Sequence, residues 1–213
     1  MHAKGRTRPA TSIARRRRSD EAVESNARLT AGLGALLFVL LAAEGVTILR
    51  IRSLLDWHVF IGIALIPVVL AKLGSTSWRF ARYYAGYPAY RRKGPPPPLL
   101  RLLGPFVVVL TGLLLVSGVA LIVVPSGAAR PVLFLHQASF VAWFAAMTVH
   151  VLGHFAETAR LAPLDWYHRT RRDVARAGAR IWVLCGSLGV GLLLGALAWG
   201  HTGAFSHFGH LAR

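Results

Sequence analysis

Five long apolar runs dominate the sequence, and polar or charged segments separate them. The runs cover approximately residues 29–49, 57–73, 102–124, 132–155 and 181–199. A helix needs about 20 mainly apolar residues to cross the hydrocarbon core of a bilayer. The pattern therefore predicts an all-α protein, an integral membrane helical bundle of about five transmembrane helices within residues 29–200.

The basic residues alternate with these runs in a way that indicates the orientation of the chain. Residues 1–28, 75–101 and 156–180 hold 20 of the 25 Lys and Arg residues. Because cytoplasmic segments are enriched in Lys and Arg, we expect a cytoplasmic N-terminus and an external C-terminus, which requires an odd number of spans. The expected protein is a multi-pass protein of the plasma membrane. Residues 1–28 would form a disordered basic cytoplasmic tail and residues 201–213 an external tail.

The composition indicates lipid as the main surroundings and no nucleic-acid partner. Hydrophobic residues make up 54% of the chain and charged residues 15%, and the mean hydropathy is +0.50. The net charge of +17 comes from clusters between apolar runs rather than from one continuous face, which favours a topology signal over a nucleic-acid surface. The single cysteine, Cys185, excludes an intramolecular disulfide and a cysteine metal cluster.

The second basic connection contains a proline run. Residues 91–94 read Arg-Arg-Lys-Gly, and residues 95–98 are four consecutive prolines. Consecutive prolines favour an extended chain without helical hydrogen bonds. We therefore expect this piece to be stiff and extended along the membrane face.

Histidines within the apolar runs are the main candidates for chemistry. His58, His136 and His150 fall inside predicted spans, and His154 lies at the edge of the fourth. An ionisable ring in lipid is costly, so it indicates a functional site by default. The second and fourth spans run in the same direction, which places His58 and His136 at nearly the same depth near the outer surface. Two imidazoles at one level on neighbouring helices can ligate a haem iron from both sides.

A second position is indicated further along the fourth span. His150 follows His136 by 14 residues, which is about 21 Å along a helix and nearly four full turns, so both side chains lie on one face of the helix. His150 could ligate a second haem near the inner surface, with His154 as a substitute or propionate partner. The inner haem would need a second iron ligand from another span, and Lys72 lies at the matching depth. A lysine at that position more often extends to the headgroups. We expect one outer haem b and keep a second, inner one as an alternative. The contrary interpretation is that these are interfacial histidines bonded to backbone or water.

Glu44 is the one carboxylate inside the first span. A charge at that depth costs at least about 2.5 kcal/mol, so the group should be protonated or paired. One interpretation is a proton acceptor near a quinol site or a hydrogen-bond partner of an outer histidine. The other is pairing with Arg50 or Arg52, one to two turns away.

Two of these features resemble the di-haem cytochrome b subunits of membrane formate dehydrogenases and nickel-iron hydrogenases. They are a histidine at the outer end of the second span, in the stretch WHVFIG of residues 57–62, and the pair His136 and His150 on the fourth. The resemblance implies that His58 and His136 hold the outer haem and that His150 holds the inner one. Its usual partner there, a histidine early in the first span, is missing from this sequence.

The resemblance also implies a role in electron transfer between a quinone pool and a partner oxidoreductase subunit. The sequence contains no Gly-rich phosphate loop and no recognisable flavin or nicotinamide fold. A partner would therefore complete the reaction, so the chain is an electron-transfer subunit rather than a stand-alone enzyme. The alternative is a haem-free membrane anchor or assembly protein whose basic loops bind anionic lipid or a partner.

Overall fold

The computed structural model describes residues 8–95 and 97–199. Its elements are α1 (Arg8–Leu49), α2 (Ile51–Tyr84), α3 (Pro88–Lys93), α4 (Pro98–Val123), α5 (Ser126–Leu161), the 3-10 helix η1 (Ala162–Asp165), α6 (His168–Arg171) and α7 (Ala177–Ala198). Within the described residues, five helices are long and apolar enough to cross a membrane, namely α1, α2, α4, α5 and α7. The prediction of an all-helical bundle with five membrane-spanning helices is confirmed.

Most of the long helices extend beyond the apolar runs that predicted them. The helix α1 has 42 residues and begins at Arg8, so the expectation of a disordered tail does not hold for residues 8–28. Arg, Ala and Glu are good helix formers, and a proline such as Pro9 is tolerated in the first turn. The C-terminal tail that was expected outside the membrane, with His201, His207 and His210, lies beyond the described residues.

The proline run is not extended over its whole length, as the sequence had suggested. Arg91, Arg92 and Lys93 end the short helix α3, and Pro98 is the first residue of α4. The first helical position accepts proline because its N–H would have no helical partner. Only residues 94–97 separate these two helices, and Pro98 is helical rather than extended.

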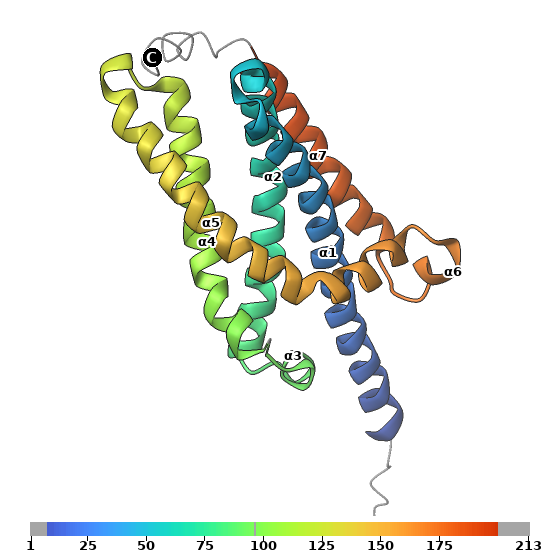
Figure 1. The fold of residues 1–213 in the computed structure, drawn as a ribbon. Helices are drawn as coiled ribbons and strands as arrows, with labels where there is room; N and C mark the ends of the chain where they lie inside the picture. The colour runs from blue at the N-terminus through green and yellow to red at the C-terminus, as the bar shows by residue number, and fades with distance from the viewer. Residues whose placement is uncertain (1–7, 96, 200–213) are drawn as a thin grey trace, which may run out of the picture.

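The long helices form two groups. The helices α1, α2 and α7 pack together, and α4 and α5 form a pair beside them (Figure 1). The turns from α1 to α2 and from α4 to α5 lie at one end of the bundle, which we call the turn end. The segments α3, η1 and α6 lie toward the other, which we call the basic end.

Small residues allow α7 to approach α2 closely. A Cβ added at Gly191 would overlap the carbonyl oxygen of Ala64, and one at Gly195 would lie 2.7 Å from that of Phe60. Backbone contact of this kind is the usual way membrane helices pack, because lipid provides no hydrophobic drive between them. These glycines therefore allow the backbone of α7 to pack directly against that of α2.

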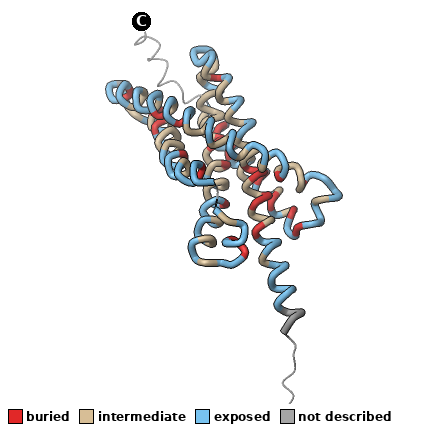
Figure 2. The backbone as a smooth tube through the Cα atoms, turned by 60° about the horizontal axis from the view of Figure 1, so that its bottom comes forward, coloured by how far each residue is buried: buried red, intermediate tan, exposed pale blue. Residues whose placement is uncertain are grey.

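The outer surface of the bundle is apolar, as lipid contact requires. Most of the backbone tube in Figure 2 is exposed or intermediate, and buried residues concentrate between helices. Large apolar side chains remain exposed on every long helix, among them Phe38, Leu70, Val116, Leu152 and Leu197. In water such a surface would be an association site, so a lipid environment accounts for it.

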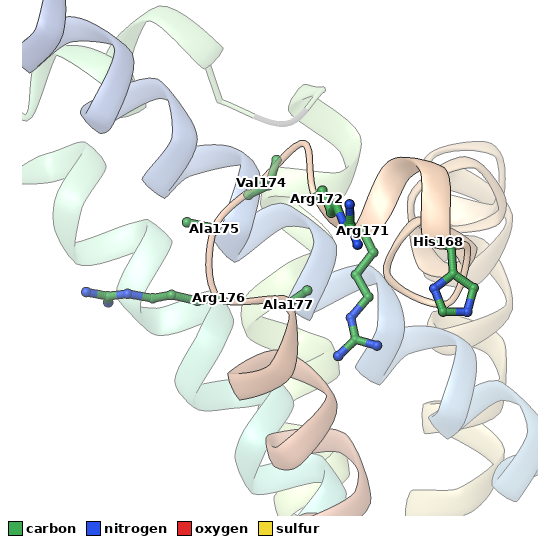
Figure 3. Close-up of a pocket in the computed structure, with 7 residues that line it drawn as sticks. All are labelled: His168, Arg171, Arg172, Val174, Ala175, Arg176 and Ala177. Atoms are coloured by element: carbon green, nitrogen blue, oxygen red, sulfur yellow. The ribbon is translucent and has the colours of Figure 1, made fainter.

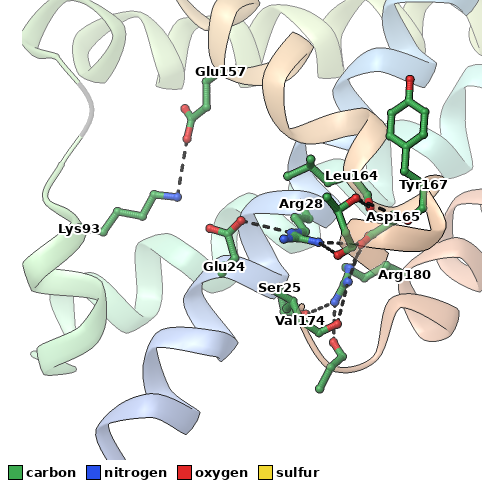
Figure 4. Close-up of polar contacts among 12 residues, drawn as sticks. Glu24, Ser25, Arg28, Lys93, Glu157, Leu164, Asp165, Tyr167, Val174 and Arg180 are labelled. Atoms are coloured by element: carbon green, nitrogen blue, oxygen red, sulfur yellow. Dashed lines mark hydrogen bonds and ion pairs between the residues drawn. The ribbon is translucent and has the colours of Figure 1, made fainter. Parts of the chain in front are cut away.

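A buried ionic network holds the basic end together (Figure 4). Asp165 of η1 accepts hydrogen bonds from Arg180 of α7, with N–O distances of 2.5 and 2.6 Å. Arg28 of α1 lies 3.5 Å from the same carboxylate and also bonds Glu24 at 3.2 Å. Arg28, Asp165 and Arg180 are all buried, so each charge needs the opposite charge of its partner to compensate for the loss of water. The network joins α1, η1 and α7.

Candidate functional site

One large cavity lies between the two groups of helices. Its volume is about 2020 Å³, and residues of α1, α2, α4 and α5 line it. Typical small-molecule pockets measure roughly 300–1,000 Å³, so this one could hold more than one cofactor-sized group. The cavity walls are mainly apolar, and every histidine of the predicted spans lines them.

His58 and His136 lie next to each other in the wall of this cavity, near the turn end. His58 comes from the start of α2 and His136 from the first half of α5. Their ring centres are 6.4 Å apart, and the ring planes are nearly perpendicular at 85°. The equal depth expected from the sequence thus corresponds to a direct juxtaposition of the two rings.

The environment of His136 fixes which ring nitrogen is protonated. Its Nδ1 lies 3.1 Å from the carbonyl oxygen of Leu114 and 3.0 Å from Oγ of Ser117, both on α4. A carbonyl can only accept, so Nδ1 donates its proton to it. Nε2 then holds a lone pair and is the nitrogen available for a metal.

His58 is held in the same tautomer by α1. Its Nδ1 lies 3.0 Å from Oε1 of Glu44 and 2.9 Å from Oγ1 of Thr47. The Thr47 hydroxyl donates its own proton to the Glu44 carbonyl at 2.6 Å, so it accepts from His58. Glu44 is therefore a hydrogen-bond partner of this histidine, and the structure pairs its carboxylate with His58 rather than with Arg50 or Arg52.

The distance between the rings suits two ligands on one metal ion. If each Nε2 binds at about 2.0 Å and lies about 1.1 Å from its ring centre, the two centres are separated by about 6 Å. The observed 6.4 Å agrees with this value. Gly118 of α4 leaves room for the arrangement, because a Cβ there would lie 3.1 Å from Cε1 of His136.

The protein provides two ligands here and not a complete metal cage. Among the described residues, no group of three or more His, Cys, Asp or Glu side chains could hold a metal ion. Two neighbouring imidazoles beside a large apolar cavity are what a bis-histidine haem site would require from a protein, because the porphyrin itself would supply the other nitrogens. The residues present therefore fit haem b.

The basic end of the cavity has a different geometry. His150 and His154 both belong to α5, one turn apart, with ring centres 4.8 Å apart and planes tilted by 56°. Rings on one helix cannot approach an iron from opposite sides. Lys72 of α2 also lines the cavity, and its ammonium group donates to the carbonyl of Thr30 at 2.5 Å. It thus contacts α1 inside the bundle instead of extending to the headgroups.

A smaller hollow of about 380 Å³ lies outside the bundle, around α6. Arg171, Arg172, Arg176 and His168 line it, together with small apolar residues. Figure 3 shows the Arg176 side chain directed away from those of Arg171 and His168, so the charges do not converge on one point. We assign no chemistry to this hollow.

Sequence reasoning proposed Glu44 as one possible partner of an outer histidine, but it did not identify the other hydrogen-bonding groups that support the two histidines. Thr47, Ser117 and the Leu114 carbonyl come from α1 and α4, and their types are common in membrane helices. The spacing of Glu44 and Thr47, three residues apart in one apolar run, was the one available signal. The Asp165 network was also missed, although Asp165 is one of only three acids in the strongly basic segment 156–180.

Comparisons with protein-family models, with curated proteins and with solved structures found no match for this chain. The assignment of the site therefore rests on its residues and geometry.

Proposed function

We propose that the protein is a membrane b-type cytochrome that relays electrons between quinone and a partner oxidoreductase. The single observation that supports this most strongly is the juxtaposition of His58 and His136. They come from different helices, their ring centres are 6.4 Å apart, and both hydrogen-bond through Nδ1. Unrelated interfacial histidines would not need to share all three properties.

Haem b, when bound between these rings, supplies a centre that is reduced and oxidised by one electron. The protein's own residues would bind this group and orient its ligands. His58 and His136 would hold the haem, while Glu44, Thr47, Ser117 and the Leu114 carbonyl hold the two rings in orientation. The apolar helices around them keep water away from the ligands.

The proposed orientation places the turn end outside and the basic end in the cytoplasm of a plasma-membrane protein. The arginines of residues 8–28, 79–101 and 160–180 all lie on the side of α3, η1 and α6. This distribution follows the positive-inside rule. The proposed haem is then close to the external surface, and a partner subunit would supply the chemistry that five apolar helices lack.

Absorption spectra of the purified protein test the proposal. We expect a sharp α-band of b-type haem after reduction with dithionite, and loss of that band in both His58→Ala and His136→Ala. His168→Ala is the matched control, since His168 is exposed on α6 and lies outside the large cavity. A folded wild-type protein without haem absorption would overturn the proposal and leave a multi-pass anchor or assembly protein.

A further inference from the structure

The N-terminal part of α1 stands clear of the rest of the molecule. Residues 12–19, which we call the arm, contain the four consecutive arginines 15–18 and no acid, and residues 12–18 are all exposed. Figure 1 shows this end of α1 extending past α3, and Figure 2 shows it as exposed tube. Arg16 lies 4.0 Å from Asp20, which follows the arm, so most of the positive charge of the arm is available to a partner.

The base of the arm is held at a fixed angle by α3. Arg92 donates to Asp20 at 2.6 Å, and Val23 clusters with the buried Ala89 and Tyr90. Residues 10–31 contain neither Gly nor Pro, the residue types at which helices most often kink. The arm is therefore a stiff extension of the membrane helix.

A topology signal accounts for the charge of the arm but not for its structure. The positive-inside rule concerns the number of Lys and Arg residues near the membrane and makes no demand on their conformation. Like charges on neighbouring turns also weaken an exposed helix. A braced helix of this composition therefore points to a binding role.

The length of α1 places the arm beyond the lipid headgroups. The apolar run of α1 begins near residue 29, and the four arginines precede it by about 16–21 Å along the helix. The headgroup layer takes up about 5–8 Å of this distance, so the arginines start about a Debye length beyond it. Anionic lipid is too distant to be the main partner.

The distribution of charge selects among the other partners. A second copy in the same membrane would direct its arm the same way and oppose arginine with arginine. Nucleic acid would meet Asp20, Glu21 and Glu24 next to the arginines, and these acids repel phosphates.

An acidic groove on a protein matches the arm better. Successive residues of a helix are about 100° apart, so the four arginines surround the axis, and opposite charges have to approach from several sides. Ile13 is 61% exposed and offers an apolar contact inside such a groove.

We propose that the arm is a docking helix for a cytoplasmic protein that encloses it in an acidic groove. Ion pairs to the four arginines and a contact with Ile13 would hold the docked protein. Docking here requires the basic end to face the cytoplasm but does not require haem, because His58 and His136 lie at the turn end. His58→Ala should therefore lose the haem band and leave docking unchanged.

Binding of fluorescent poly-L-glutamate to the full-length protein in phosphatidylcholine nanodiscs, followed by anisotropy, tests the recognition of acidic groups. Binding should weaken about tenfold or more in the combined variant Arg15→Gln, Arg16→Gln, Arg17→Gln and Arg18→Gln. The matched control removes the same charge from an exposed loop, by Arg169→Gln, Arg171→Gln, Arg172→Gln and Arg176→Gln. An equal loss in both variants would overturn the proposal.

Nanodiscs that also contain phosphatidylglycerol test the distance of the arm from lipid. The difference between the arm variant and the loop control should persist in them, because the arm stands beyond the headgroups. Disappearance of that difference would assign the arm to lipid and overturn the proposal.

Photo-crosslinking from Ile13 in the native cells tests whether the partner is a protein. A photoreactive phenylalanine analogue there should give one discrete protein adduct, which the loop control keeps and the arm variant loses. Ser19→Pro keeps every charge but breaks the helix, so it should lose the adduct, whereas Ser19→Ala should keep it. The absence of a protein adduct, an adduct with nucleic acid or phospholipid alone, or an unchanged adduct in Ser19→Pro would each overturn the proposal.

Discussion

Oε1 of Glu44 lies 3.0 Å from Nδ1 of His58, so the one carboxylate of the first apolar run hydrogen-bonds to a histidine that we propose as a haem ligand. A carboxylate in this position makes the imidazole a stronger electron donor to the metal. Stronger donation stabilises the oxidised metal and lowers the reduction potential.

We therefore expect Glu44→Gln to raise the reduction potential of the haem by several tens of millivolts, where about 59 mV corresponds to a tenfold change in a one-electron equilibrium. Redox titration followed at the α-band measures it. Glu21→Gln, an exposed residue near the other end of α1, is the control and should leave the potential unchanged. An unaltered potential in Glu44→Gln would show that the contact does not tune the site.

Gly118 should be essential for the position of His136. A side chain at this residue would meet the imidazole, because even its Cβ would lie 3.1 Å from Cε1. We expect Gly118→Val to reduce the haem content several-fold, measured as haem absorbance per protein. Gly112→Val is the matched control on the same helix, since a Cβ at Gly112 has no neighbour within 4 Å. Equal haem content in the two variants would contradict the role of Gly118.

The ionic network at the basic end should contribute strongly to stability. Asp165→Asn leaves the buried Arg28 and Arg180 with an uncompensated charge, and removing one partner of such a group costs about 3 kcal/mol or more. Unfolding in SDS, followed by circular dichroism, would measure the loss. Asp173→Asn, an exposed residue of the same loop, should change the free energy of unfolding by less than about 0.5 kcal/mol. A similar stability of both variants would show that the network is dispensable.

The membrane-spanning part of the fold could be predicted from the sequence because lipid constrains it so strongly. Every backbone group in the hydrocarbon core needs an internal hydrogen bond, so a long apolar run has to be helical. That constraint ends where the apolar run ends. Residues 8–28 and 74–84 are rich in charged, polar or aromatic residues, and their helical state follows from propensity and packing, which an apolar run does not reveal.

The pair of His58 and His136 could be anticipated because depth in a membrane is a one-dimensional property that can be read from position in a span. The direction in which a side chain points around its helix is different, since it depends on which helices are neighbours. The contact of Ser117 with His136, and the choice of His58 rather than an arginine as the partner of Glu44, required the arrangement of α1 and α4 beside the two histidines. The same holds at the basic end, where the hydrogen bond of Lys72 to the Thr30 carbonyl depends on α1 lying beside α2.

The packing of α7 on α2 should tolerate no side chain at Gly191. A Cβ there would overlap the backbone carbonyl of Ala64, and backbone cannot move aside as a flexible side chain can. We expect Gly191→Ala to destabilise the protein by about 1–3 kcal/mol, as overpacking does in well-packed interiors, measured by SDS unfolding. Gly189→Ala, two residues away with nothing within 4 Å of its Cβ, should be neutral or slightly stabilising because alanine is the better helix former. If the two variants unfold alike, α7 is not held by close backbone contact, and its place beside α2 needs another explanation.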